Sequence, residues 1–189
     1  AVADRRPPLF RVIFEGDMTT FGFGGEFFEN DANLNLGQSF AYLAEAKRNR
    51  YNPHSNLQFI NYGEVDTTLK VLMDRWHILY KNRRPCMVSL LVGIDDVVQA
   101  RKKGGTFDAS QYESTLTAAL QEMRTDRPDI GAMLCTVAVF KTRSSIVEDQ
   151  YDGFMRDVAA LNAAISATAS KLRLPLVDFA KRFQQEFDR

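Results

Sequence analysis

The feature that most constrains the fold is an alternation of short apolar runs with longer segments of helical periodicity. Short continuous apolar runs are typical of strands that are covered on both faces of a sheet. The five runs are LFRVIFEGD (9–17), LQFINYG (57–63), CMVSLLVG (86–93), IGAMLCTVAVF (130–140) and LPLVDF (174–179). Such an alternation favours a parallel sheet with helices on both faces, so we expect a three-layer α/β sandwich of about five strands. The run 86–93 is the expected central strand.

Apolar residues at helical spacing predict the helices between these runs. The pattern indicates helices near residues 40–44, over 65–80, after Asp108 and over 154–172, with a further helical stretch at the end of the chain. Asp66 and Asp108 are the expected N-caps of the second and third of these helices, because aspartate side chains accept hydrogen bonds from helical N–H groups.

Length and charge limit the number of domains and the kinds of partner. The chain has 189 residues, of which 45% are hydrophobic, so we expect one domain over residues 1–189 with a flexible leader at 1–8. Its 24 lysines and arginines balance 24 aspartates and glutamates, so no net field favours nucleic acid. The basic clusters at 47–50, 81–84 and 101–103 are interpreted as solvated edges. No apolar run is long enough to predict a transmembrane segment.

The cysteines and the first residue bear on the compartment. Cys86 and Cys135 lie in apolar runs without a disulfide or metal-ligand spacing, which favours a reducing environment. We therefore expect an intracellular protein, of the cytoplasm or the mitochondrial matrix. The start at Ala1 fits either a trimmed chain or the removal of a targeting peptide.

Three short motifs follow the first three expected strands. They are VIFEGDMTTFGFG, INYGEVDTT and LLVGIDDV, in that order. In this order they resemble the first three blocks of the SGNH (GDSL-type) hydrolases, a superfamily of lipases and acylhydrolases with a flavodoxin-like α/β fold. The resemblance implies a serine nucleophile after G-D and an oxyanion hole that includes the Gly63 N–H and an asparagine of G-x-N-D. It also implies a histidine base in a final D-x-x-H block.

The chain departs from this pattern at each catalytic position. Met18 stands where the resemblance places the serine, and Asp95 stands where it places the asparagine. A thioether has no proton to lose, and a carboxylate repels an oxyanion instead of donating a hydrogen bond to it. If Asp178 aligns with the aspartate of the last block, Lys181 takes the place of the histidine; otherwise the chain stops short of that block.

The two histidines do not replace the missing base. His54 lies in a polar loop, and His77 lies on the expected helix 65–80 beside Trp76. Both are therefore interpreted as packed or surface residues and not as catalytic groups.

These departures predict a pseudoenzyme, with no catalytic residues, cofactor or metal, that serves as a structural or accessory subunit or as a binding module within a larger protein complex. Protein partners are expected, and a small acyl or carbohydrate ligand remains an alternative occupant of the vestigial pocket. The residues expected to line that pocket are Gly16, Asp17, Met18, Gly63, Gly93, Asp95, Asp96 and Asp178.

Two enzymatic alternatives remain. One is an esterase with non-standard catalytic residues, in which Thr19 or Thr20 supplies the hydroxyl. The other is a metal-dependent activity, because oxygen-rich clusters suit Mg²⁺ or Ca²⁺. Its candidate ligands are Glu15, Asp17, Asp95, Asp96 and Asp178, although such residues also commonly cap turns.

The glycine-rich segment FGFGGEFFEN, residues 21–30, lacks a nucleotide-binding fingerprint. No G-K-[ST] follows Gly22, Gly24 and Gly25, and Phe27 stands where G-x-G-x-x-G needs its last glycine. Its aromatic residues predict either a loop folded onto the sheet edge or a protein-contact patch.

Overall fold

A computed structural model describes residues 10–22, 39–54, 56–139 and 148–187. Five parallel strands form one sheet in the order β2-β1-β3-β4-β5. The strands are β1 (Phe10–Gly16), β2 (Leu57–Asn61), β3 (Met87–Leu91), β4 (Gly131–Cys135) and β5 (Leu176–Val177). The expected α/β fold with a five-stranded parallel sheet is therefore confirmed, and β3 is the central strand, as predicted.

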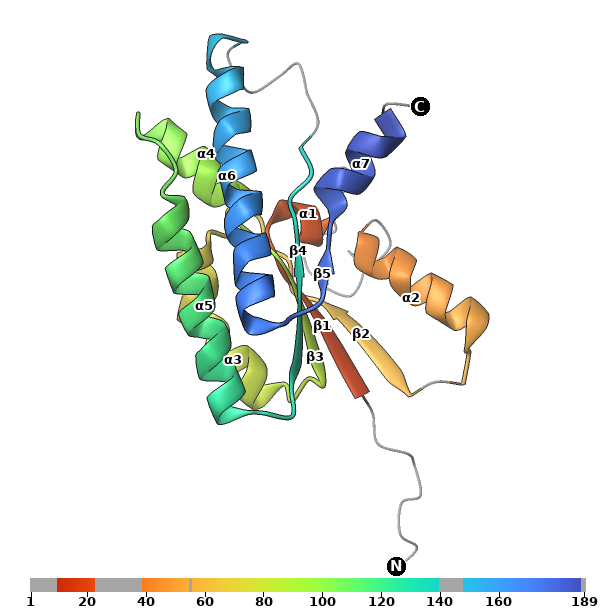
Figure 1. The fold of residues 1–189 in the computed structure, drawn as a ribbon. Coiled ribbons are helices and arrows are strands. Elements are labelled where there is room, and N and C mark those ends of the chain that lie inside the picture. The colour runs from red at the N-terminus through yellow and green to blue at the C-terminus, as the bar shows by residue number, and fades with distance from the viewer. Residues whose placement is uncertain (1–9, 23–38, 55, 140–147, 188–189) are drawn as a thin grey trace, which may run out of the picture.

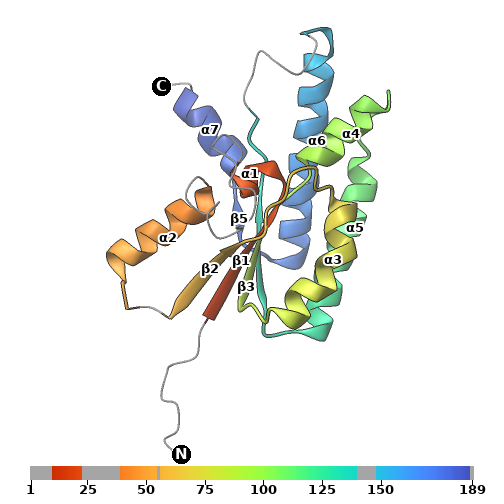
Figure 2. The ribbon, with the colours of Figure 1, turned by 180° about the vertical axis from the view of Figure 1, so that it is seen from behind.

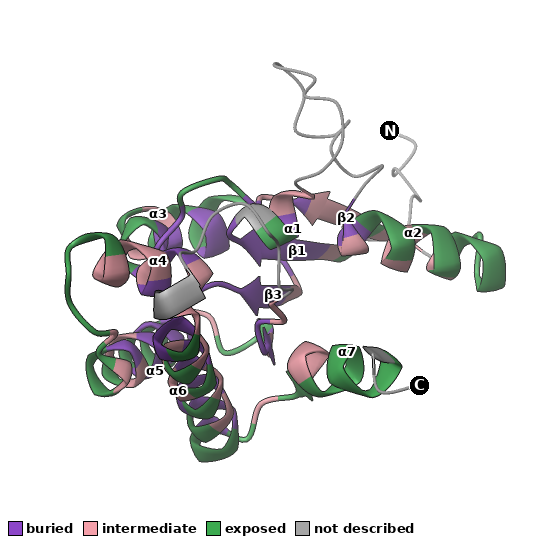
Figure 3. Ribbon diagram, turned by 90° about the horizontal axis from the view of Figure 1, so that it is seen from above, coloured by how far each residue is buried: buried purple, intermediate pink, exposed green. Residues whose placement is uncertain are grey.

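Seven helices over the described ranges surround this sheet. They are α1 (Met18–Phe21), α2 (Phe40–Tyr51), α3 (Leu69–Asn82), α4 (Ile94–Lys102), α5 (Ala109–Asp126), α6 (Glu148–Leu172) and α7 (Phe179–Phe187). Helices α3, α4, α5 and α6 cover one face of the sheet, and α2 and α7 lie on the other (Figures 1 and 2). Seen from above, the strands are buried between these two helical layers (Figure 3).

The two faces of the sheet bury cores of different size. The larger core joins α3, α5 and α6 to β3 and β4, with Leu72, Leu120 and Leu161 fully buried. The smaller one lies under α2, where Phe14 contacts the rings of Phe40 and Phe59 edge-on. The strands thus bury side chains on both faces, which explains why they are continuous apolar runs.

The second expected helix begins later than predicted. Helix α3 starts at Leu69 and its N-cap is Thr68, whose hydroxyl accepts a hydrogen bond from the Val71 N–H at 3.3 Å. Asp66 is not an N-cap, because it has a φ of 59° in the loop before the helix. The prediction for Asp108 is confirmed: its carboxylate accepts a hydrogen bond from the Gln111 N–H at 2.9 Å.

Two helices were not predicted. The four-residue α1 follows β1 directly, and α4 follows β3 after Gly93, whose φ of 127° is a conformation that residues with a side chain rarely adopt. The expected leader at 1–8 and most of the segment 21–30 lie outside the described residues.

Candidate active site

The segments of the three motifs meet at one edge of the sheet. Because all strands are parallel, the carboxyl ends of β1, β2 and β3 lie at the same edge. There the Asp17 N–H donates to the Leu91 carbonyl at 3.2 Å, and the Glu64 N–H donates to the Gly16 carbonyl at 3.0 Å. The switch point of the strand order lies between β1 and β3, where ligands bind in open α/β sheets.

Asp17 is a fully buried carboxyl group at the start of the first turn. Its Oδ1 accepts a hydrogen bond from the Thr19 N–H at 2.9 Å, and its buried Oδ2 has no partner among the described residues. Burial raises the pKa of Asp17 to about 7, and the negative charge of Asp95 adds to this shift. Hydrogen bonds from the backbone and side chain of Thr19 lower this pKa in part. Asp17 is therefore poised to exchange a proton near neutral pH.

The two threonines of α1 have different environments. Thr20 is fully buried, and its hydroxyl donates to the Leu91 carbonyl at 3.3 Å, so it serves the packing of α1 on β3. Thr19 is exposed and lies next to Met18, the residue at the expected serine position. Of these two hydroxyl groups, only that of Thr19 is accessible to a substrate.

Gly63 permits close packing of the second motif against α1. A Cβ atom at this position would lie 2.3 Å from the Phe21 nitrogen. Its N–H donates to the Asn61 side-chain oxygen at 2.9 Å, and the Asn61 amide nitrogen donates to the Thr20 carbonyl at 2.8 Å. The expected oxyanion donor is thus held by Asn61 in this structure. Asn61 was not among the predicted site residues, because its contact with α1 forms only in the folded chain.

The two acidic residues of the third motif lie in the first turn of α4. Asp95 is buried and its Oδ2 has no partner among the described residues. Burial is the main cause that raises its pKa, and the charge of Asp66 adds to it. Asp96 accepts a hydrogen bond from the Leu69 N–H at 2.9 Å, and burial raises its pKa to about 6. Asp96 therefore binds the first N–H group of α3, in addition to the N-cap Thr68, whereas Asp95 lies beside Asp17.

Asp178 and Lys181 occupy the start of α7. The Oδ1 atom of Asp178 accepts hydrogen bonds from the Thr136 hydroxyl at 2.9 Å and from the Lys181 N–H at 3.0 Å. Asp178 is therefore a helix N-cap. The side chain of Lys181 is exposed. None of the described hydrogen bonds joins Asp178 to Asp17 or Asp95, although all three follow strands of the same sheet.

The acidic residues do not gather into a metal centre. Among the described residues, no group of three or more histidine, cysteine, aspartate or glutamate side chains is arranged to hold a metal ion. Glu15 pairs with Arg75 of α3, and Asp96 accepts a hydrogen bond from the first N–H group of the same helix. The structure thus gives the metal-dependent alternative no support over these residues.

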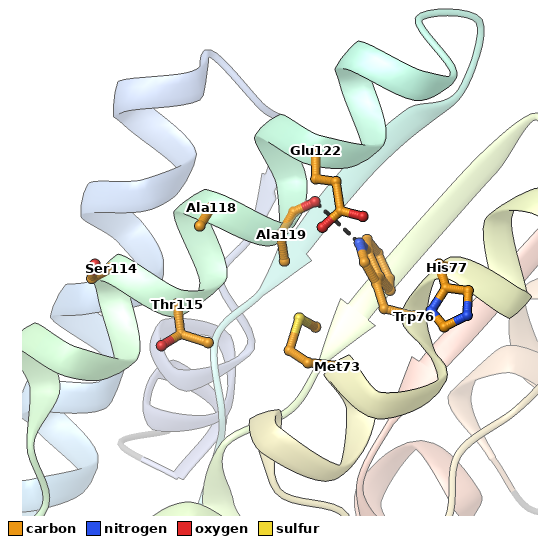
Figure 4. Close-up of a pocket in the computed structure, with 8 residues that line it drawn as sticks. All are labelled: Met73, Trp76, His77, Ser114, Thr115, Ala118, Ala119 and Glu122. Carbon is orange, nitrogen blue, oxygen red and sulfur yellow. Dashed lines mark hydrogen bonds between the residues drawn. The ribbon is translucent and has the colours of Figure 1, made fainter.

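The two histidines lie away from this edge. His77 is exposed on the body of α3, beside a hollow of about 420 Å³ between α3 and α5 (Figure 4). Trp76 lines the same hollow and donates its indole N–H to the Ala119 carbonyl at 3.1 Å. His54 is exposed after α2.

Both cysteines are free thiols; Cys135 is buried and Cys86 is half-buried.

Comparison with known proteins places this arrangement in a known fold. A GDSL-like lipase from Parabacteroides merdae has a TM-score of 0.76 and 18% identity, over 95% of this chain and 81% of its own. An acetylxylan esterase from Geobacillus stearothermophilus has a TM-score of 0.75 and 20% identity, over 95% of this chain and 80% of its own. The acetylxylan esterase AlAXEase has a TM-score of 0.68 and 22% identity, over 92% and 79%.

This chain has the fold of the GDSL-like hydrolases. No protein-family model matches the sequence, and no curated protein matches it either. None of the helices in the described ranges is long and apolar enough to cross a membrane.

The expectation of a protein without catalytic activity is contradicted by these comparisons. Solved structures that share the fold include a GDSL-like lipase and acetylxylan esterases, which are enzymes. The expectation relied on Met18, on Asp95 and on the missing histidine of the last block. The sequence offered Thr19 or Thr20 only as an alternative nucleophile, and it did not reveal that Thr19 is exposed or that the pKa of Asp17 is raised to about 7.

Proposed function

We propose that this protein hydrolyses short acyl esters with non-standard catalytic groups at the carboxyl end of β1. The observation that carries the proposal is the exposed Thr19 hydroxyl next to the buried carboxyl group of Asp17. A nucleophilic hydroxyl needs a base within hydrogen-bond reach, and a base works best when its pKa is near the working pH. Asp17, with a pKa of about 7, meets the second requirement, and its hydrogen bonds to Thr19 support the first.

The reaction is proposed to proceed in two steps. The Thr19 oxygen attacks the ester carbonyl while Asp17 takes the hydroxyl proton. The ester C–O bond then breaks, and Asp17 returns this proton to the leaving alcohol. In the second step, Asp17 takes a proton from water as the water attacks the acyl group on Thr19. The acid is released and the proton returns to Thr19.

The proposed substrates are acetyl esters, including acetylated carbohydrates. The support for this class is that two of the solved structures with this fold are acetylxylan esterases. Asp95 limits the rate, because its carboxyl group lies beside Asp17 where an oxyanion hole needs a donor. We therefore expect a slow esterase compared with enzymes that keep the serine and histidine.

The test is steady-state hydrolysis of p-nitrophenyl acetate and of acetylated xylo-oligosaccharides. Thr19→Val removes the hydroxyl with little change in volume and is expected to lower kcat/KM roughly a hundredfold or more. The matched control is Thr125→Val on the exposed end of α5, which is expected to retain wild-type rates. Equal rates for wild type and Thr19→Val would refute the role of Thr19, and no turnover by the wild type would refute the function.

A further inference from the structure

We infer that Arg75 of α3 is a positioning residue for the candidate active site, because it ties the end of β1 to the loop that carries Gly63. This inference rests on the proposed function for its catalytic consequence. Its structural consequence can be measured separately.

The guanidinium group of Arg75 joins the end of β1 to the segment that follows β2. It donates a hydrogen bond to Glu15, two residues before Asp17, and forms an ion pair with Glu64, the residue after Gly63. It also donates to the Tyr62 carbonyl at 3.4 Å. One side chain of α3 therefore contacts both residues that flank Gly63 and the strand that leads into the nucleophile turn.

Few backbone hydrogen bonds join the end of β1 to the loop after β2. The Tyr62 N–H donates to the Phe14 carbonyl at 2.7 Å, and the Glu64 N–H donates to the Gly16 carbonyl at 3.0 Å. Beyond Glu64 the loop leaves the strand and passes through Asp66, which has a positive φ. Arg75 secures the loop at the point where the strand pairing ends.

The contacts of Arg75 position the loop more than they stabilise the fold. Glu15 is fully buried, and its Oε2 and the Arg75 Nε have no hydrogen-bond partner among the described residues. Buried ion pairs often cost as much in desolvation as they gain in attraction, and incomplete pairing makes this balance worse. Arginine, however, presents several donors in a rigid plane, so it can fix two carboxylates and a carbonyl at once.

The position of Gly63 against α1 depends on the contacts that Arg75 makes with β1 and with the loop. Gly63 packs directly against the backbone of Thr20 and Phe21, so a shift of the loop also shifts the turn that carries Thr19. A displacement of about 1 Å at a reacting group costs up to roughly a hundredfold in rate. Loss of Arg75 is therefore expected to act on kcat, because the residue does not touch the substrate.

The test compares Arg75→Met with Arg101→Met, a matched variant. Arg101 is also partly buried, pairs with Asp157 and donates to the Gly153 carbonyl at 2.6 Å, but it joins α4 to α6. Both variants remove an ion pair and are expected to lower the melting temperature. Only Arg75→Met is expected to lower kcat, by roughly 10- to 100-fold with KM little changed, and to speed hydrogen exchange of amides 62–67.

Two further variants separate positioning from stability. Arg75→Lys keeps the charge but cannot reach both carboxylates together, so kcat is expected to stay low. The double variant Glu15→Met, Arg75→Met replaces the pair by apolar side chains and is expected to recover stability without recovering kcat. Recovery of kcat with stability would overturn the inference. If the wild type hydrolyses no ester, the proposed function fails, and unchanged exchange of amides 62–67 in Arg75→Met would then overturn the positioning role by itself.

Discussion

At the residue scale, the candidate site depends on two neighbouring carboxyl groups with different tasks. Asp17 contacts Thr19 and has a pKa raised to about 7, mainly by burial. Asp95 stands where the sequence resemblance places an asparagine, and its charge raises the pKa of Asp17 further. One group is proposed to move the proton, and the other is proposed to lower the rate by its negative charge.

Replacement of Asp95 by asparagine is expected to raise the rate. The amide removes the charge beside Asp17 and restores a hydrogen-bond donor, so kcat/KM for p-nitrophenyl acetate should rise about tenfold.

The pH profile of the same variant gives a second readout. The rate should increase with pH, since the base acts in its ionised form, and the midpoint of this pH profile should move below the wild-type value of about 7. Asp108→Asn, which keeps the cap of α5, is the control. A lower rate in Asp95→Asn would assign Asp95 a positive role instead.

At the element scale, the site is held by close contacts between short segments. Gly63 allows the loop after β2 to touch α1, and Asn61 bridges the two by accepting from Gly63 and donating to Thr20. The start of α7 is held to β4 through Asp178 and Thr136. Each element can be tested by one substitution.

Gly63→Ala is expected to destabilise the protein and to lower esterase activity. The added Cβ would lie 2.3 Å from the Phe21 nitrogen and 2.6 Å from the Thr20 carbonyl carbon, and both are backbone atoms that cannot move without α1. Overpacking of this kind typically costs about 1–3 kcal/mol. Gly131→Ala is the control, because its nearest neighbour would be an ordinary contact at 3.6 Å. Equal chemical denaturation curves for the two variants would contradict the close packing.

Asp178→Ala is expected to lower the free energy of unfolding by about 1 kcal/mol, because α7 loses its N-cap. The exposed Lys181, by contrast, should tolerate alanine with a change of less than about 0.5 kcal/mol and no loss of activity. Urea unfolding and ester hydrolysis measure both effects. A large loss of activity in Lys181→Ala would show that this lysine takes part in the reaction.

The elements were predictable to different degrees. The strands follow from continuous apolar runs, which are typical of a sheet covered on both faces, and the cap at Asp108 follows from local chemistry. Helices α1 and α4 were missed because they begin inside the motifs, whose glycine and aspartate residues are typical of loops. The roles of Asn61 and Arg75 were not predictable, since they depend on contacts across 41 and 60 positions of the chain.

At the scale of the whole molecule, buried carboxyl groups link stability to pH. Burial is the main cause that raises the pKa of Glu15 from 4.5 to about 8 and that of Asp17 from 3.8 to about 7. A group with a raised pKa in the folded state stabilises the fold fully below its unfolded pKa, and this contribution is lost as pH rises through the folded pKa. Stability is therefore expected to fall from about pH 5 to pH 8.

Calorimetry across this range measures the effect. In Glu15→Gln the melting temperature should depend less on pH, because one of the two titrating groups is gone. Glu113→Gln on α5 is the control and should keep the wild-type slope. A melting temperature that rises from about pH 5 to pH 8 in the wild type would contradict the assignment.

Activity was the property of the whole molecule that the sequence motifs predicted wrongly. The substitutions at Met18 and Asp95 indicated a protein without catalysis, whereas solved structures with this fold include a lipase and an esterase. The exposure of Thr19 and the raised pKa of Asp17 both depend on how α1 and α4 pack on the sheet. These environments follow from the tertiary structure, so the motifs alone could not reveal them.

The most direct test of the central claim is whether Thr19 carries the acyl group during turnover. The protein is incubated with p-nitrophenyl acetate, quenched in acid, digested and analysed by tandem mass spectrometry. We expect one acetyl group on Thr19, absent from Thr19→Val and present in Thr125→Val. Turnover by the wild type with the acetyl group on another residue, or with none on Thr19, would contradict the claim.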